Sequence, residues 1–542
     1  MRGRPTGLLF MAPRSRNPAR TAQPTQGPDR APAEAGSPAG ALRPWQWFVL
    51  AAAIPLMLSS SKLDLDLWHD EVYTIEAFVS RGVATIVTDY TVPNNHVLYS
   101  LVLRPFYLLS DSNFVLRLPS LACTAGTLAI VFLLARRWAG LPAALLGTWL
   151  LGSNQMFLVH TVQIRGYALS MLLSAWLGWL TLATGEVVSW RRTALIVLAG
   201  AAFLYVLPTN LLFLVPMAAV ACTLAWFRGE ARARAALLEG ANWLAAGALA
   251  ALLYLPIADR ILSARAEDVG VSWGGAWNVH ADFFASAAYD MVPLLPLPAI
   301  GLACWAFAWT RGRRGTGEVL LLWGLALVAG SFLLTAVLGI TPFVRNYSPL
   351  LPPLAAATGW LLAQLCEAAR GRLAPRCPPE LAATLMMLLV GIVVVPRLVS
   401  YPARLDEYRK GQFAQGGYYN YYAARYHPAR VAAYLQDQLQ EQIVDDRPYY
   451  IAYDDHDHMN LWYYLAKCGV PPYRQLGRSP AGAEAVVYAI VPPVPDYAAI
   501  EAKCGLAPGT VRRFPLVEEF GYYRLLRSPG PVRIRVAGVH RP

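Results

Sequence analysis

Charged residues are scarce in this chain of 542 residues. Asp, Glu, Lys and Arg together account for 15% of it, whereas hydrophobic residues account for 56%. A soluble protein carries roughly 25% charged residues, so the composition excludes an ordinary soluble globular chain. The sequence also lacks the P-loop and the glycine-rich dinucleotide fingerprint with which proteins bind nucleotide phosphates. A nucleotide substrate is therefore not indicated.

The apolar residues are grouped in many runs of about 15 to 22 residues, close to the length of a helix that spans a bilayer. These runs predict a mostly α-helical, polytopic membrane protein with about eleven transmembrane helices. The expected spans are roughly 45–61, 114–135, 139–159, 167–184, 193–208, 210–227, 241–257, 291–310, 318–340, 348–366 and 381–400.

The net charge of +12 is carried mainly by arginines in short clusters between the apolar runs. Such clusters are typical of cytoplasmic loops, and this explanation outweighs nucleic-acid binding, so no nucleic-acid partner is expected. The clusters alternate with the other connecting segments only if the apolar run Val97–Leu109 does not cross the membrane. Its length of about a dozen residues is also below the roughly 20 that a spanning helix needs. We therefore expect interfacial helices there, within a first outer loop at 62–113.

Three domains are expected. Residues 1–43 are rich in Pro, Ala, Gly and Arg, which is typical of a disordered tail, and their arginines place the tail in the cytoplasm. Residues 44–400 form the transmembrane domain, in the inner (plasma) membrane. Residues 401–542 contain the strand-like segments PYYIAYD and AVVYAIVP and predict a small soluble α/β domain outside the cytoplasm. Its two cysteines, Cys468 and Cys504, lie where oxidation can occur, so a disulfide between them is a hypothesis.

The first outer loop holds the most concentrated acidic stretch of the chain. Five carboxylates lie between Asp64 and Glu76, and the polar sequence Asn94-Asn95-His96 follows. Asp70 and Glu71 begin an amphipathic helical pattern, so one interpretation is that they stabilise the N-terminus of a helix. The other is catalytic, because a partly shielded carboxylate can act as a general base. The position of the pair, beside a second polar cluster in an outer loop, favours the catalytic interpretation.

Further motifs follow the acidic pair along the chain. They are, in order, the W-x-D-E context that ends in Glu71, then PNNHVLYSLV, Phe114–Arg137, QIRGYAL and VRNYSPLLP. This ordered series resembles the membrane-embedded C-type glycosyltransferases. The likeness is to the protein O-mannosyltransferases and their bacterial relatives, which include the aminoarabinose transferases. It is strong over residues 45–185, looser as far as residue 400 and weak beyond that.

The resemblance implies a polyprenyl-phosphate-linked sugar as donor, with its lipid tail between helices and its phosphate at the outer surface. It also implies that Asp70 is the general base that deprotonates an acceptor hydroxyl, and that Glu71 orients the acceptor or supports Asp70. The sugar would move in one inverting displacement in which the lipid phosphate leaves. The resemblance leaves a hexose or a pentose open as the sugar, and a protein, a lipid or a glycan of the cell envelope open as acceptor.

A leaving phosphate needs positive charge or hydrogen-bond donors nearby. An arginine at a membrane interface can equally be a snorkelling anchor, and Arg104 and Arg117 are interpreted in that way. Gln163 stands where some relatives carry an acid, so a divalent cation is left open and no metal ligand is assigned. The residues expected to contact the lipid phosphate or the sugar are His96, Asn95, Arg165, Arg345, Tyr347 and Trp273.

Two rival functions and one loop complete the sequence-based picture. A transporter or flippase keeps ionisable groups near the middle of the bilayer, often in two related halves, whereas here the charges cluster at the ends of the expected helices. A non-catalytic scaffold would leave the acidic first loop unexplained. The loop 258–290, with Trp273 and Trp277, fits either stacking on a sugar or an aromatic belt, and we expect it to be a mobile lid.

Overall fold

The structure is a computed structural model, and the chain divides into two units, Met1–Pro44 and Trp45–Pro542. The predicted disordered tail lies almost wholly outside the described residues, and the same holds for residues 401–427 of the expected C-terminal domain. The structure describes residues 42–60, 63–90, 94–160, 162–182, 189–228, 232–267, 277–278, 280–281, 283–284, 296–310, 316–340, 342–373, 376–399, 428–444, 449–453, 458–470, 484–491, 495–503, 505–520 and 523–533.

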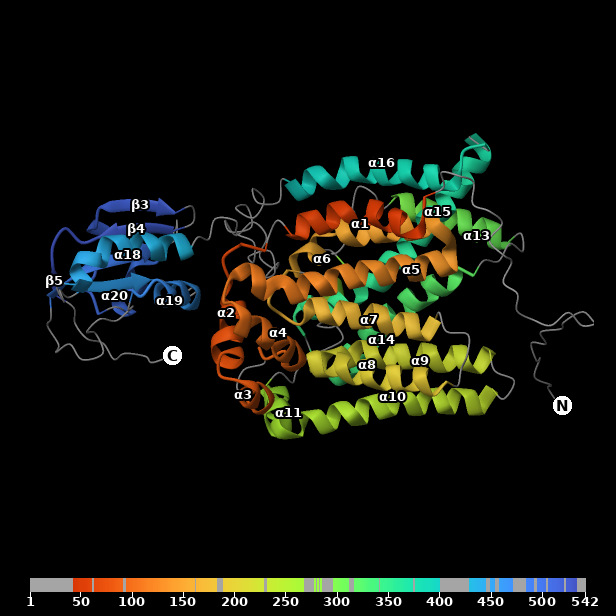
Figure 1. The fold of residues 1–542 in the computed structure, drawn as a ribbon, viewed down its shortest axis with the longest axis horizontal. Helices are drawn as coiled ribbons and strands as arrows, with labels where there is room; N and C mark the ends of the chain where they lie inside the picture. The colour runs from red at the N-terminus through yellow and green to blue at the C-terminus, as the bar shows by residue number, and fades with distance from the viewer. Residues whose placement is uncertain are drawn as a thin grey trace, which may run out of the picture. The chain divides into compact units, whose positions relative to one another are not determined.

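Long apolar helices make up the larger part of the protein. α5 packs against α7 and α15, and α10 packs against α8 and α9; Figure 1 shows α5, α7, α9 and α10 running lengthwise beside one another. Because these helices are apolar around most of their circumference, their surfaces suit lipid as well as protein neighbours. The helices are α1 (Pro44–Ser60), α5 (Asn113–Ser153), α7 (Tyr167–Leu182), α8 (Trp190–Val206), α9 (Leu211–Arg228), α10 (Arg232–Tyr254), α13 (Pro296–Thr310), α14 (Glu318–Leu338), α15 (Leu351–Leu373) and α16 (Pro379–Val399).

The mostly helical, multi-pass membrane architecture predicted from the sequence is confirmed. Within the described residues, five helical segments are long and apolar enough to cross a membrane. Each predicted span overlaps an apolar helix, and α5 takes two of them on either side of Gly140, whose φ of 84° interrupts the helix. Glycine tolerates this left-handed backbone because it has no Cβ. The count of eleven spans stays a prediction. The five segments are Asn113–Ser153, Pro208–Phe227, Arg232–Leu262, Glu318–Leu338 and Val344–Arg372.

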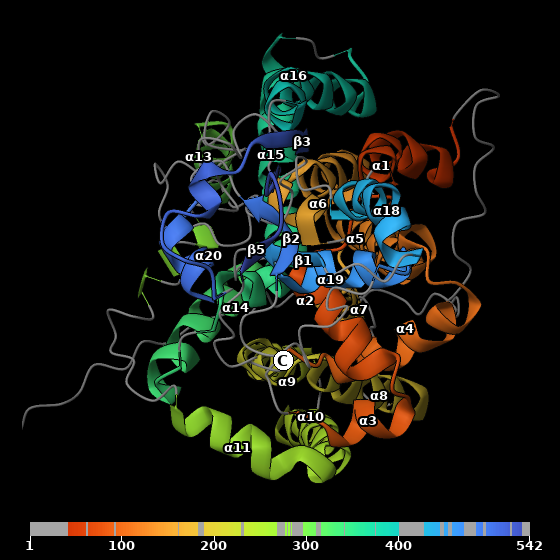
Figure 2. The same cartoon turned by 90° about the vertical axis from the view of Figure 1, so that its left-hand side faces the viewer.

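The described residues of the predicted first outer loop fold into four short helical elements. Figure 2 shows α2, α3 and α4 grouped together, and α4 packs against α3, η1, α5 and α8. The run Val97–Leu109 is a helix of 13 residues, shorter than a span requires. It buries Tyr99 and Leu103 and exposes Leu108 and Leu109, as expected of a helix with one face on protein. The elements are α2 (His69–Tyr73), the π-helix η1 (Thr74–Val79), α3 (Val83–Thr88) and α4 (Val97–Leu109).

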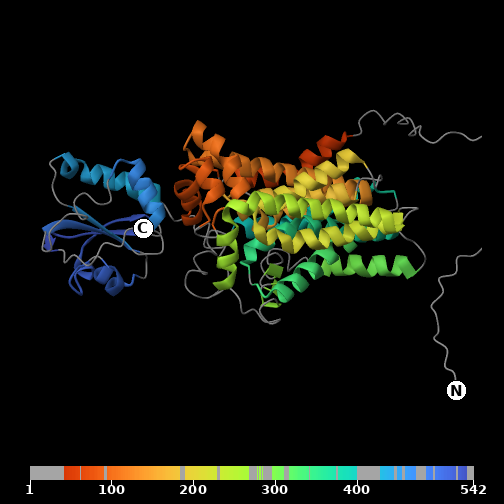
Figure 3. The same ribbon diagram turned by 90° about the horizontal axis from the view of Figure 1, so that it is seen from below.

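The C-terminal region forms the predicted small α/β fold around one mixed sheet with strand order β1-β2-β4-β3. The segments PYYIAYD and AVVYAIVP form β1 and β2, which pair in parallel, while β4 runs antiparallel to both β2 and β3. Helices lie on both faces of the strands (Figure 3). The elements are α18 (Pro428–Val444), β1 (Tyr449–Tyr453), α19 (His458–Lys467), β2 (Glu484–Val491), α20 (Tyr497–Lys503), β3 (Leu516–Phe520), β4 (Tyr523–Arg527) and β5 (Val532–Arg533).

Alternate residues of β2 face opposite sides of the sheet, which explains why helices cover both sides. Ala489 and Val491 pack on Ile500 of α20, whereas Tyr488 and Ile490 face the opposite way, toward the apolar side of α18 and α19. The sequence left open whether this region contains a disulfide. Cys468 is a free thiol, which contradicts its disulfide with Cys504, and Cys504 itself lies outside the described residues.

Candidate functional site

The acidic pair lies in the first turn of α2, where negative side chains are favourable at the positive end of the helix dipole. Both interpretations of the pair thus describe part of what is observed. The Thr74 hydroxyl donates to the carbonyl of Asp70 over 2.8 Å, and the chain continues from Thr74 as a π-helix rather than an α-helix. Segments of π-helix are frequent at functional sites. The local backbone therefore sets this turn apart from an ordinary helix start.

Asp70 is approached by two arginines from distant parts of the chain. One nitrogen of Arg165 and one of Arg345 each lie 3.7 Å from the same oxygen, Oδ2, of Asp70. The side chain of Arg165 is 3% exposed, while those of Asp70 and Arg345 are each 18% exposed. Two guanidinium groups beside one carboxylate leave one positive charge in excess, because Arg stays protonated in proteins. This cluster of Asp70, Arg165 and Arg345 therefore favours an anionic ligand.

Arg165 is placed by the turn between α6 (Gln155–His160) and α7. A nitrogen of its guanidinium lies 3.5 Å from the carbonyl oxygens of both Asp70 and Asn94. The next residue must be glycine, since a Cβ on Gly166 would come within 2.4 Å of Val206 and 2.7 Å of His96. The close contact lets the amide of Gly166 donate to Nδ1 of His96 over 2.7 Å. The arginine turn and the polar Asn-His segment are thus joined.

His96 is buried, with 2% of its surface exposed. Burial, with smaller effects from the charges of Arg165 and Arg345, lowers the pKa of this imidazole well below its usual 6.5. The ring is therefore neutral at physiological pH. Because Nδ1 accepts the bond from Gly166, the proton of the neutral ring is assigned to Nε2. His96 is thus a neutral N–H donor close to two cations.

Arg345 comes from η5 (Val344–Leu350), which precedes α15. Its Nε donates to the hydroxyl of Tyr167 over 2.8 Å, and its guanidinium lies 4.2 Å from the centre of the Phe343 ring. Tyr167 also packs edge-on against His96, with ring centres 5.1 Å apart. Tyr167 therefore connects the arginine to the histidine. The sequence analysis missed this residue, although it follows Arg165 and Gly166 directly in the motif QIRGYAL.

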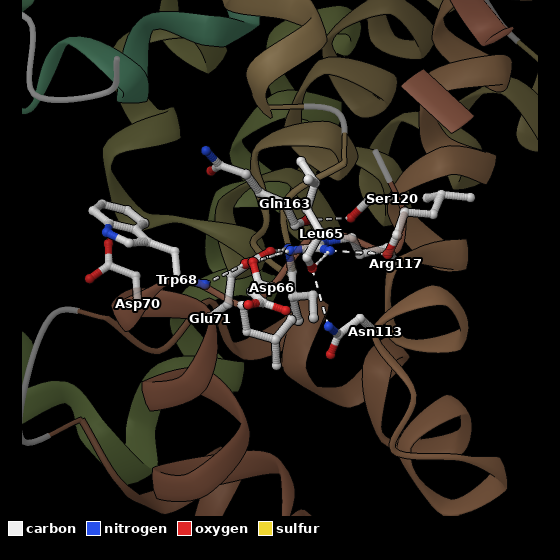
Figure 4. Close-up of polar contacts among 12 residues, drawn as sticks. Leu65, Asp66, Trp68, Asp70, Glu71, Asn113, Arg117, Ser120 and Gln163 are labelled. Carbon is white, nitrogen blue, oxygen red and sulfur yellow. Dashed lines mark hydrogen bonds and ion pairs between the residues drawn. The ribbon is translucent and has the colours of Figure 1, made fainter. Parts of the chain in front are cut away.

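Glu71 points away from Asp70 and forms a closed ion pair with Arg117, as the dashed lines in Figure 4 show. The two side chains lie 2.9 Å apart and are 0% and 1% exposed. The backbone amides of Trp68 and Ile164 donate to the two oxygens of Glu71 over 2.9 and 2.7 Å. A buried ion pair is stable only when its remaining hydrogen-bonding groups are satisfied, and here both carboxylate oxygens are used.

Arg117 is not the interfacial anchor that the sequence predicted. Besides Glu71, its guanidinium donates to the carbonyls of Leu63, Leu65 and Asp66. An anchoring arginine keeps its charged head in water or among lipid headgroups, whereas this one is completely enclosed. Arg117 therefore fixes the chain that leads into α2.

Two of the predicted ligand contacts have their side chains engaged elsewhere. The amide nitrogen of Asn95 donates to the carbonyls of Ile86 and Asp89, and its oxygen accepts from Ser100. Asn95 thus closes its own loop. Tyr347 is fully buried and shares a 2.7 Å hydrogen bond with Thr335 of α14.

The remaining candidates have other partners or lie outside the described residues. Arg104 donates to the carbonyl of Val79. Trp273 lies outside the described residues. Of the predicted lid, Trp277 is 66% exposed and His280 is buried against Tyr347.

A divalent cation does not suit the donors that surround Asp70. Among the described residues, no group of three or more His, Cys, Asp or Glu side chains could hold a metal ion. The neighbours of the single carboxylate are two guanidinium groups, which repel a cation and have no lone pair to offer it. The backbone carbonyl of Gln163 accepts a hydrogen bond from the hydroxyl of Ser120 over 2.5 Å. No step of the chemistry is therefore assigned to a metal.

Comparison with solved structures identifies the fold. The crystal structure of ArnT, an aminoarabinose transferase, from Cupriavidus metallidurans bound to undecaprenyl phosphate matches with a TM-score of 0.50 and 14% identity, over 89% of this chain and 98% of that chain. The chain has the fold of the C-type glycosyltransferases. The family resemblance predicted from the ordered motifs is thus confirmed at the level of the fold.

Other comparisons are weaker. The apo state of the same ArnT gives a TM-score of 0.47 at 15% identity, over 89% of this chain and 98% of that chain. The oligosaccharyltransferase of Archaeoglobus fulgidus with zinc and sulfate gives 0.39 at 14% identity, over 70% of this chain and 57% of that chain. TM-scores below 0.5 do not by themselves establish a shared fold. No protein-family model and no curated protein sequence matches the chain.

Proposed function

We propose that the chain is a glycosyltransferase that moves a hexose or pentose from a polyprenyl-phosphate donor to an acceptor hydroxyl at the outer face of the membrane. The observation that carries the proposal is the approach of Arg165 and Arg345 to one carboxylate oxygen of Asp70. A group able to take a proton and two groups able to neutralise a phosphate lie in one place. ArnT, whose fold the chain shares, was crystallised with undecaprenyl phosphate, which supports a lipid phosphate as the ligand of this cluster.

In the proposed reaction, Asp70 takes the proton of the acceptor hydroxyl while the acceptor oxygen attacks the anomeric carbon of the sugar. The bond between that carbon and the phosphate oxygen breaks, and its electron pair leaves with the lipid phosphate. The sugar is inverted at the anomeric carbon. A positioned carboxylate of this kind contributes about 10²–10⁴-fold to the rate.

The arginines act on the leaving group. Negative charge grows on the phosphate as the bond breaks, and positive groups placed in advance stabilise the transition state more than the ground state. Arg165 is held by carbonyl oxygens and Arg345 by Tyr167, so both guanidinium groups are in position before the donor arrives. His96, as a neutral Nε2–H donor, is a further candidate for contact with the phosphate or the sugar.

Glu71 has a different task from Asp70. The sequence left two roles open for it, orienting the acceptor or supporting Asp70. Both of its oxygens are occupied and its side chain is fully buried, which favours the supporting role. We propose that Glu71 and Arg117 hold the start of α2 so that Asp70 is presented to the acceptor.

The proposed reaction requires a topology with the site outside the cytoplasm, since the activated sugar arrives on a lipid. We propose eleven spans in the inner membrane, with the N-terminus in the cytoplasm and with residues 62–113 and 401–542 outside it. The alternation of arginine clusters supports this arrangement. The acceptor is proposed to be a protein, a lipid or a glycan that reaches the site from the outer side.

The test is transfer by the full chain reconstituted in lipid nanodiscs, with a panel of radiolabelled undecaprenyl-phosphate sugars. Asp70→Asn should lower kcat by at least 100-fold, because the amide cannot accept the proton. Asp64→Asn is the matched control, since Asp64 is an exposed carboxylate of the same loop, and it should retain wild-type activity. Full activity in Asp70→Asn would rule out the assigned base. Wild-type protein that, in sealed liposomes, moves the labelled lipid across the bilayer without transferring its sugar would indicate a flippase.

A further inference from the structure

Tyr464, on α19 of the C-terminal region, is hydrogen-bonded to the chain that leads into the proposed active site. Its hydroxyl oxygen accepts from the backbone amide of Leu67 over 2.8 Å and from the side-chain amide of Asn113 over 2.9 Å. The same nitrogen of Asn113 also donates to the carbonyl of Leu65 over 3.2 Å. The phenol of Tyr464 therefore binds a segment that lies 397 positions earlier in the sequence.

A second contact joins the same segment to α18. An oxygen of the Asp66 carboxylate accepts from the backbone amide of Ala429 over 3.2 Å, in the first turn of that helix. The first-turn amides of a helix have no partner within the helix, and a carboxylate there also favours the helix dipole. Asp66 therefore supplies the hydrogen-bond acceptor that, in an ordinary N-terminal cap, comes from the residue directly before the helix. Residues 65–67 are thus engaged by both α18 and α19.

Tyr464 and Leu67 are buried at this junction, whereas an ion pair at its edge is exposed. Tyr464 is 6% exposed and Leu67 is 1% exposed, and Leu67 packs in one apolar cluster with Val72 and with Leu435 of α18. By contrast, the ion pair between Lys467 and Asp111 at the edge of the same contact has side chains 29% and 64% exposed. Exposed pairs of this kind contribute little. The hydroxyl of Tyr464 is therefore a polar contact in the buried part of this junction.

The segment it holds ends in the proposed catalytic residues. Trp68 follows Leu67 directly, and its amide donates to Glu71. Arg117, the ion-pair partner of Glu71, donates to the carbonyls of Leu65 and Asp66. Tyr464 of the C-terminal region and Arg117 of α5 therefore both form hydrogen bonds with peptide groups of residues 65–67. A shift of this stretch would move Asp70 relative to Arg165 and Arg345.

We propose that Tyr464 is a positioning residue for the transfer reaction, and that the C-terminal region completes the active site by fixing residues 65–67. The proposal rests on the proposed function and deepens it. Tyr464 acts through the peptide chain that carries Asp70 and not on the substrate. Its loss should lower kcat without weakening donor binding, since Arg165 also binds the carbonyl of Asn94 and Arg345 is held by Tyr167.

Tyr464→Phe removes only the hydroxyl. The adjacent Tyr463→Phe is a matched control, because Tyr463 is on the same helix, is 8% exposed, and has no hydrogen-bond partner for its hydroxyl among the described residues. Two measurements are made on the full chain in nanodiscs. The first is amide hydrogen exchange of the peptide that contains Leu67, which does not depend on activity. The second is steady-state transfer, with kcat and the KM for the lipid-linked sugar determined separately.

Tyr464→Phe should accelerate exchange at Leu67 at least fivefold and lower kcat about tenfold, with KM within twofold of wild type. Tyr463→Phe should match wild type in every quantity. Unchanged exchange at Leu67, or faster exchange with unchanged kcat, would overturn the positioning role. A fall in kcat matched by an equal rise in KM would overturn it as well, because it would indicate direct contact with the donor. If wild-type protein shows no transfer at all, the proposed function fails, and exchange at Leu67 alone then decides whether Tyr464 holds the segment.

Discussion

Glu71 and Arg117 are 46 residues apart in the sequence and form an ion pair that solvent does not reach. The pair joins three stretches of chain, since Glu71 also binds the amide of Ile164 and Arg117 also binds the carbonyl of Leu63. Asp70 lies on the first of these stretches and Arg165 follows directly on another. The relative position of the proposed base and one proposed phosphate-binding arginine is therefore set by a neighbouring carboxylate whose oxygens are both occupied.

The first prediction concerns this ion pair. Glu71→Ala should destabilise the protein by about 3–5 kcal/mol, because it leaves the charge of Arg117 buried without its partner. Thermal unfolding in detergent, followed by tryptophan fluorescence, measures the loss. Glu367→Gln is the control, since it removes a pair with Arg370 whose side chains are 24% and 59% exposed, and its unfolding curve should match wild type. Equal curves for all three proteins would show that the buried pair contributes nothing.

The second prediction concerns space at Gly166. Gly166→Ala should displace His96 or Val206, since the added carbon would lie 2.7 and 2.4 Å from their atoms. Overpacking of this kind costs about 1–3 kcal/mol, and transfer activity should fall because Arg165 is the preceding residue.

The control for that substitution is Gly247→Ala on α10, where no described atom beyond the helix's own neighbouring backbone lies within 4 Å of an added carbon. This change should leave stability equal or slightly higher, because alanine favours a helix by up to about 1 kcal/mol over glycine. Unfolding midpoints and transfer rates of both variants test the pair. An active, stable Gly166→Ala protein would contradict the crowding argument.

The third prediction concerns pH. Burial of His96 and the nearby charges of Arg165 and Arg345 lower the pKa of its ring in the folded state. The unfolded chain takes up a proton below about pH 6.5 that the folded ring does not. The contribution of His96 to stability should therefore be constant above pH 6.5 and fall below it, by about 1.4 kcal/mol per pH unit for one proton.

Unfolding midpoints of wild type and of His96→Gln between pH 7.5 and 5.0 measure this dependence. The glutamine variant has no ring to titrate, so its decline with acid should be shallower by one proton. A decline of equal slope in the two proteins would show that His96 takes up its proton in the folded state as well.

The fourth prediction concerns the anionic ligand. Arg345→Ala should weaken binding of undecaprenyl phosphate about tenfold or more, because a hydrogen bond to a charged group contributes about 1.5–3 kcal/mol and tenfold corresponds to about 1.4. Binding to nanodisc-embedded protein can be followed by displacement of a fluorescent lipid phosphate. Arg81→Ala, which removes an exposed arginine of the first outer loop, should bind as wild type does. Equal losses in both variants would point to general charge attraction at the surface.

Much of the architecture follows from local properties of the sequence. Helices need long apolar runs and the strands β1 and β2 need short ones with β-branched and aromatic residues, and both patterns are visible without tertiary information. The meeting of Asp70 with Arg165 and Arg345 was also within reach, because charged residues in an apolar chain gather where the helices end. For these residues, chemical type and place along the chain were enough.

The direction in which individual side chains point could not be predicted from the sequence. Asn95 and His96 are neighbours of similar polarity, yet one closes its own loop and the other faces Gly166. Arg117 has the sequence context of an interfacial anchor but meets a carboxylate that lies 46 positions earlier. Tyr464 is one of two consecutive tyrosines, and only the second meets Leu67. Each of these outcomes depends on which surface a neighbouring element presents, and that is decided by tertiary packing.

The stretch from Leu63 to Glu71 has consequences for anyone who wishes to alter the specificity of this protein. Its peptide groups are hydrogen-bonded to Arg117 of α5, to Arg165 of the turn before α7 and to Tyr464 of the C-terminal region. Substitutions within it must be matched by changes at several remote positions at once, so such variants will be rare in libraries that change one residue at a time. New sugar or acceptor preferences should be sought first at exposed positions such as Trp277, where an exchange disturbs a ring contact with Phe332 and none of the hydrogen bonds described for this stretch.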